Sequence, residues 1–152
     1  YCVSPWGLSW DAENYYLIGY DSEAEKIKHY RVDKMLHIQM TEEQREGREL
    51  YQKLDLASYS RKSFGMFGGK EEKVRLRVRN DLVGVIIDRF GKEVMMVPGQ
   101  EGYFTVSVDV NVSSQFFGWI FALGMGVEIL VPEWVKDEIK REIGKVMEMY
   151  AK

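Results

Sequence analysis

The residues best suited to chemistry lie within the first 34 positions, where tyrosines stand close to basic side chains. The members of this candidate ligand site are Tyr16, Tyr20, Tyr30, Arg31 and Lys34. A tyrosine ring offers a flat stacking surface and a hydroxyl group, and an arginine offers a planar fork of donors that fits phosphate. Together they suit a nucleotide or a short single strand, whose bases stack while cations hold the backbone.

A plainer interpretation of the same residues stays open. Tyrosines are ordinary strand residues, and Arg31 and Asp33 can form a surface ion pair. A straight strand also puts Arg31 and Lys34 on opposite faces. Both can reach one ligand only if a bulge or turn lies near Asp33.

A second basic group alternates with apolar residues further along the chain. Its members are Lys73, Arg75, Arg77 and Arg79, opposite Val74, Leu76 and Val78. In a strand the four cations share one face, where like charges repel, so an anionic neighbour is expected. We name Arg75, Arg77 and Arg79 as possible polyanion-binding residues. The alternative neighbour is an acidic side chain such as Asp109 on a paired strand.

Reaction machinery is not apparent in the sequence. It contains no G-x-S-x-G, HExxH or P-loop pattern, and its two histidines and single cysteine are too scattered for a zinc site. The carboxylates of the last helix alternate with basic residues, which predicts a solvated charged face. We therefore expect no enzyme activity, no metal and no cofactor.

The first part of the chain predicts short antiparallel strands. They cover Trp6 to Trp10, Tyr15 to Tyr20 and Lys26 to Met35, separated by polar turn residues. A helix beginning at Thr41 is expected within residues 41–55, with Leu50 and Leu54 on one face. The glycine-rich stretch from Phe64 to Gly69 indicates a connector. The domain boundary is expected between residues 41 and 72.

The second part predicts the order β-α-β-β-α-β-α, a ferredoxin-like sandwich with one helix appended. The strands are residues 73–79, 93–97, 103–112 and 127–131. One helix runs from a cap at Asn80 to Gly91, and another from Ser113 or Ser114 to Leu123. The last helix begins at Pro132 and Glu133, with an apolar stripe at Val135, Ile139, Ile143, Val146 or Met147, and Tyr150.

Composition limits the remaining possibilities. The 152 residues are 45% hydrophobic and 30% charged, which is typical of a globular chain of one or two domains. The net charge of -3 disfavours a stand-alone binder of duplex DNA. A single cysteine, Cys2, indicates a reducing compartment, and the cytoplasm is expected. The longest apolar run falls short of a membrane span, so no membrane partner is expected.

The N-terminal motifs, taken in order, resemble the WYL domain. They are Pro5, Leu8, Tyr15-Tyr16-Leu17, Gly19-Tyr20-Asp21 and Tyr30-Arg31-Val32-Asp33-Lys34-Met35. Leu54-Asp55-Leu56 and Phe64 to Gly68 resemble the segment that follows this domain. Residues 73–152, with their Gly-Val-Glu-Ile-Leu-Val-Pro strand, resemble the WCX extension of the same family.

The resemblance implies an α+β fold with three parts. Residues 1–40 would form a small SH3-like (Sm-like) β-barrel, residues 41–72 a helical or irregular connector, and residues 73–152 a ferredoxin-like domain. The chain starts with Tyr1 rather than Met, and we expect a fragment that lacks the first strand or strands of the barrel and the helix-turn-helix domain.

The resemblance also implies a role in bacterial transcription regulation. The WYL part would sense a nucleotide or single-stranded nucleic acid as effector, duplex DNA would be bound only through the missing N-terminal domain, and the protein would be a homodimer. By position, Tyr16, Arg31 and Lys34 match the family's ligand-binding residues. Tyr15 replaces a tryptophan of the family, which preserves a stacking surface. Lys34 replaces an arginine, which keeps the positive charge but loses the bidentate guanidinium. The runner-up is a constitutive oligomerisation or protein-interaction module that binds no small ligand.

Overall fold

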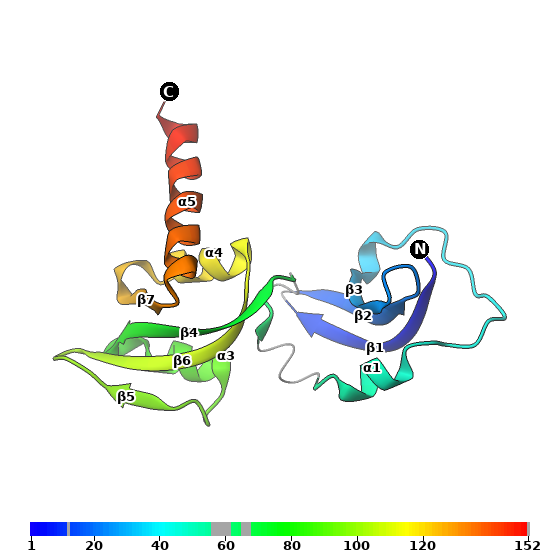
Figure 1. Cartoon of the computed structure of the whole chain (residues 1–152), viewed down its shortest axis with the longest axis horizontal. Coiled ribbons are helices and arrows are strands. Elements are labelled where there is room, and N and C mark those ends of the chain that lie inside the picture. The colour runs from blue at the N-terminus through cyan, green and yellow to red at the C-terminus, as the bar shows by residue number, and fades with distance from the viewer. Residues whose placement is uncertain (12, 56–61, 65–67, 152) are drawn as a thin grey trace. The chain divides into compact units, whose positions relative to one another are not determined.

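A computed structural model describes residues 1–11, 13–55, 62–64 and 68–151. The chain divides into two compact units, Tyr1–Ser60 and Arg61–Lys152. Each is built around one antiparallel sheet, and the class is α+β (Figure 1). Residues 56–61 and 65–67, which form part of the predicted connector, lie outside the described residues.

The first unit is a three-stranded sheet in the order β1-β2-β3. Its strands are β1 (Val3–Asp11), β2 (Asn14–Asp21) and β3 (Lys26–Arg31), and β2 and β3 are joined by the polar turn that the sequence predicts. Tyr16 and Ile18 of the central strand are buried. The described residues of this unit form an open sheet and not a closed barrel.

Two local expectations in this unit are wrong. The third strand ends at Arg31 instead of Met35, and the chain turns into a short 3-10 helix, η1 (Val32–Lys34). Helix α1 covers only Arg48–Lys53 and follows Gly47, so Thr41 does not start it. The stretch from residue 41 to residue 46 contains no apolar side chain, and a helix there would have had nothing to bury.

The second unit is a four-stranded sheet in the order β5-β6-β4-β7, with every pair antiparallel. Its strands are β4 (Lys70–Arg79), β5 (Met96–Pro98), β6 (Tyr103–Val112) and β7 (Val127–Val131). The 3-10 helix η2 (Asn80–Leu82) and α3 (Val83–Phe90) connect β4 to β5. Helix α4 (Ser114–Ala122) and η3 (Gly124–Gly126) connect β6 to β7, and α5 (Glu133–Tyr150) follows β7.

One face of this sheet carries the core. Val74, Leu76 and Val78 of β4 are fully buried, as their alternation predicts, and α3 and α4 supply Ile86 and Phe116 to the same cluster. The row of cations lies on the other face, because successive side chains of a strand point to opposite sides.

The termini of the elements agree only in part with the sequence. The Ser113 side chain caps α4 by accepting a hydrogen bond from the Phe116 N–H at 3.2 Å, as expected. Asn80 instead lies in η2, and Leu82 precedes α3 without a side-chain cap. Phe64, assigned by its glycine-rich surroundings to a connector, is buried in the core of the second unit.

Helix α5 is buried only over its first turns and extends away from the sheet (Figure 1). Val135 is fully buried and Ile139 packs against the core. The rest of the predicted stripe, Ile143, Val146, Met147 and Tyr150, is exposed. Among the described helices, none combines the length and apolar character needed to span a membrane.

Candidate functional site

The short helix η1 brings two basic residues to one carboxylate. The Arg31 guanidinium donates from Nε to Asp33 Oδ1 at 3.0 Å and from Nη2 to Asp33 Oδ2 at 2.8 Å. Lys34 Nζ lies 3.7 Å from the same Oδ2. A straight strand would have separated Arg31 from Lys34, so the turn after Arg31 is what allows both to face one anionic group.

The Arg31 side chain has a further partner across the sheet. Its Nη2 also donates to Asn14 Oδ1 at 2.8 Å, which holds the guanidinium beside the start of β2. Hydrogen bonds from Arg31 lower the pKa of Asp33, and the same pair raises the pKa of Arg31. All these groups lie at the surface, where an incoming anion can compete with Asp33.

Tyr16 lies next to this cluster but is mostly covered. It is the cross-strand partner of Arg31, with a side chain only 6% exposed. Its ring centre lies 6.1 Å from that of His29, and the two rings are arranged edge to face. Burial lowers the pKa of His29. Tyr16 therefore borders the site more than it offers an open stacking surface.

The other two predicted tyrosines lie away from the cations. Tyr20 pairs with Ile27 at the far end of β2, about 13 Å along the strand from Tyr16, and its ring lies against Gly47. Tyr30 is on the opposite face from Arg31, because adjacent strand residues alternate. The structure brings Arg31 and Lys34 together, and it does not place Tyr20 or Tyr30 beside them.

Tyr30 instead belongs to a buried polar group around Asp21. Its hydroxyl donates to Asp21 Oδ2 at 2.6 Å, and Lys28 Nζ donates to the same oxygen at 2.7 Å. The hydrogen bond from Lys28, followed by that from Tyr30, holds the pKa of Asp21 well below its usual range. Burial, and then the bond to Asp21, raises the pKa of Tyr30. This arrangement joins β2 to β3 and supports the sheet.

In the second unit, acidic side chains neutralise much of the basic row. Arg77 pairs with Glu128 at 2.5 Å and lies over the Tyr103 ring at 5.3 Å. Arg79 makes a two-pronged contact with Asp81, at 2.6 and 2.7 Å. Lys73 and Arg75 stand opposite Asp109 and Ser107 in the register. Ion pairs within the unit therefore account for two of the three cations predicted to bind a polyanion.

Sequence reasoning missed one contributor to the first cluster. Asn14 is a strand residue whose contact with Arg31 depends on the register between β2 and β3, which no local pattern reveals. Within the described ranges, no group of three or more His, Cys, Asp or Glu is placed to hold a metal ion.

The fold is that of a two-unit α+β protein with a small, mostly β N-terminal unit and a larger α/β unit. The cluster of Arg31, Asp33 and Lys34 belongs to the N-terminal unit. Residues 1–40 match the WYL domain, and residues 70–147 match the WCX domain. The second match covers just over half of the chain, so the chain belongs to the WCX family and carries a WYL domain before it.

Comparison with individual proteins adds little. No curated protein matches the sequence. A solved structure, proteasome accessory factor B/C (PafBC) of Arthrobacter aurescens, is similar with 16% identity and a TM-score of 0.40. The match covers 90% of this chain and 21% of that one, so the chain spans about a fifth of that protein's length. A likeness of this size carries no inference about fold or function.

Proposed function

We propose that the chain is the effector-sensing and dimerising region of a cytoplasmic bacterial transcription regulator, without catalytic activity. Its effector would be a nucleotide or a short single-stranded nucleic acid, and duplex DNA would be bound through another domain. The WYL and WCX matches support this role. The order β5-β6-β4-β7 supports the ferredoxin-like assignment. Three antiparallel strands followed by a 3-10 helix are compatible with part of an SH3-like barrel.

One observation carries the proposal for the site. Arg31 and Lys34 both lie beside the Asp33 carboxylate, and the Arg31 guanidinium already binds that carboxylate through a bidentate pair of hydrogen bonds. A phosphate group of the effector presents the same pair of acceptor oxygens and more negative charge. It would take the place of Asp33, and Tyr16 and Asn14 would form the edge of the bound site.

Effector binding acts on the rest of the protein only through differential affinity. A ligand shifts a conformational equilibrium when it binds one arrangement more tightly than another. Displacing Asp33 releases a residue of η1, the element that links β3 to the chain leading to the second unit. The connector would carry that change to the dimer interface and to the DNA-binding domain.

The matching prediction concerns the Arg31 fork. Arg31→Ala is expected to weaken binding of single-stranded oligonucleotides or cyclic dinucleotides by about 10- to 100-fold, because charge-assisted hydrogen bonds are lost. Asp33→Asn is expected to tighten binding by about two- to fivefold, because a competing surface charge is removed. Isothermal titration calorimetry on the whole chain measures both changes.

The second unit provides a matched control. Arg79 precedes η2 and holds Asp81 in the same two-pronged contact, but Leu82 stands where the first unit has Lys34. Arg79→Ala should leave effector affinity unchanged. If Arg79→Ala abolishes binding and Arg31→Ala does not, the effector binds the basic row of β4 and the site assignment is wrong.

A second candidate function, a constitutive oligomerisation module, is favoured by the uncovered end of α5. Val146 and Met147 are 51% and 66% exposed on a helix that extends away from its unit. We expect Val146→Asp to abolish dimerisation while changing the free energy of unfolding by less than about 0.5 kcal/mol. Sedimentation equilibrium tests this, with Val83→Asp on α3 as the half-exposed control. Dimers that persist without ligand and are insensitive to Arg31→Ala would favour this function over sensing.

A further inference from the structure

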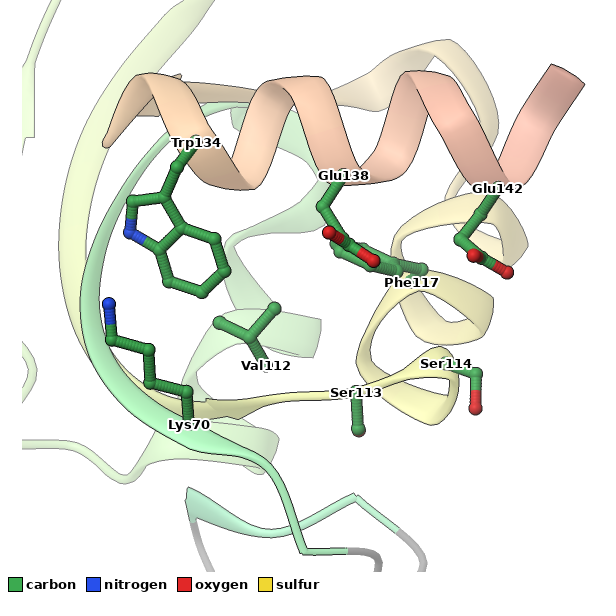
Figure 2. A pocket seen from close by; sticks show the side chains of 8 residues that line it. All are labelled: Lys70, Val112, Ser113, Ser114, Phe117, Trp134, Glu138 and Glu142. Atoms are coloured by element: carbon green, nitrogen blue, oxygen red, sulfur yellow. The ribbon is translucent and has the colours of Figure 1, made fainter.

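A groove runs between α5 and the junction of β6 with α4 (Figure 2). Its volume of about 440 Å³ lies in the range of sites that hold small molecules or parts of peptides. The residues that line it are Lys70, Val112, Ser113, Ser114, Phe117, Trp134, Glu138 and Glu142. All belong to the second unit, and none of them is used by the effector site.

The groove has an apolar base whose aromatic ring is held in place. Trp134 Nε1 donates to Glu72 Oε2 at 3.0 Å, and the Lys70 ammonium lies 4.4 Å from the centre of a Trp134 ring. Lys70 Nζ is also 3.8 Å from Glu72 Oε2, so Glu72 neutralises the one cation of the lining. Phe117 and Val112 also line the groove (Figure 2). They are only 3% and 9% exposed, so the half-buried Trp134 provides most of the apolar surface.

One wall is acidic. Trp134, Glu138 and Glu142 are four residues apart, which puts them on one side of α5 in successive turns. The side chains of both glutamates are about a third exposed, and each contacts a basic residue three positions along the helix, Arg141 or Lys145. A carboxylate has about four acceptor positions, so these exposed pairs leave capacity for an incoming cation.

The opposite wall of the groove has no basic side chain among its described residues that would neutralise Glu138 and Glu142. It is formed by Ser113 and Ser114 at the start of α4, as Figure 2 shows. Beyond Glu142, the same side of α5 continues into Val146 and Met149, which are 51% and 72% exposed. The surface thus joins an aromatic base, two carboxylates and an apolar strip in one continuous line.

We propose that this groove docks a basic amphipathic segment of a protein partner. Apolar side chains of the segment would lie on Trp134 and along Met149, and its arginine or lysine residues would meet Glu138 and Glu142. An amphipathic helix laid into a groove is a recurrent mode of peptide recognition. The charge of the wall selects a basic segment over an acidic one.

The test uses the whole chain and two short fluorescein-labelled amphipathic peptides, one of leucine and arginine and one of leucine and glutamate. Fluorescence anisotropy should show binding of the arginine peptide only, weakened by salt. The double variant Glu138→Lys with Glu142→Lys should weaken that binding by about tenfold or more, since two charge contacts become repulsive. The matched control is Asp137→Lys with Glu148→Lys, which makes the same charge change on another side of α5 and should leave the affinity unchanged.

Three outcomes would overturn the proposal. Equal binding of both peptides would show that charge plays no part, and equal weakening by the two double variants would show a general charge effect instead of a site. Self-association of the chain that the Glu138 and Glu142 variant abolishes, without peptide binding, would assign the groove to a second copy. Because Arg31 takes no part in the docking, effector binding and peptide binding can each fail independently.

Discussion

Phe64→Ala is expected to lower the free energy of unfolding of the Arg61–Lys152 unit by about 3–5 kcal/mol. Phe64 is 5% exposed, and the centre of its ring lies 5.3 Å from the ring centre of Phe116 and 5.4 Å from that of Trp119. Arg89 covers its other side, with the guanidinium carbon 3.9 Å from the ring centre. Removing the ring therefore leaves a cavity that these rigid neighbours cannot fill.

The backbone beside Phe64 adds to the expected loss. Arg89 Nη2 donates to the Ser63 carbonyl at 2.5 Å, and the buried Asn111 amide donates to Ser63 Oγ at 2.9 Å. These bonds hold the segment before β4 in the core, where polar groups without partners would be costly. A cavity at Phe64 loosens the segment that keeps them paired.

Urea denaturation followed by fluorine NMR of fluorotryptophan measures this change, since Trp119 and Trp134 report on the second unit alone. Phe121→Ala is the control, because Phe121 is 48% exposed on α4 and its truncation should cost less than about 1 kcal/mol. If both variants lose the same small amount, Phe64 contributes no more than a surface ring and the placement in the core is wrong.

Phe64 also shows where sequence reasoning stops. The strands β6 and β7 were predicted with their observed bounds, because alternation is local and a buried face repeats every second residue. Phe64 has no periodic neighbours, and the rings that bury it come from helices far along the chain. Its glycine-rich surroundings therefore indicated a connector, while its burial depends on tertiary contacts that no local pattern contains.

For the candidate site too, the local sequence indicates some features and tertiary structure decides the others. The residue types Arg31 and Lys34 could be chosen from the sequence because guanidinium and ammonium groups have a definite chemistry. Their convergence depends on η1, a three-residue helix too short to leave a periodic signal. Tyr20 and Tyr30 had the right chemistry, but the register and the alternation of faces separate them from the cations.

The last helix shows a third kind of limit. Its apolar stripe predicted α5 correctly, but a stripe shows only that a surface is apolar and not which surface covers it. Val135 is buried in the core of its own unit, whereas Val146 is 51% exposed and does not belong to the described core cluster. The same pattern therefore supports both the fold and the proposed contacts with other chains.

Gly47→Ala is expected to lower the free energy of unfolding of the Tyr1–Ser60 unit by about 2–4 kcal/mol. Gly47 precedes α1 with φ at +74°, a left-handed conformation that costs alanine about 1 kcal/mol or more. A methyl group there would also lie 2.2 to 2.5 Å from Tyr20 side-chain atoms, too close for contact without movement. The Tyr20 ring cannot yield easily, because it is half-buried in the sheet.

Gly102→Ala separates the two contributions. Gly102 has a similar φ of +83°, but no atom lies within 4 Å of a methyl group placed there. Its substitution should lower the free energy of unfolding of the second unit by about 1 kcal/mol, which is the cost of the left-handed backbone conformation alone. Hydrogen exchange at the Ile18 amide measures the first loss and at the Leu76 amide the second. If the two losses are equal, the Tyr20 ring moves aside freely, and Gly47 is required for its backbone conformation alone.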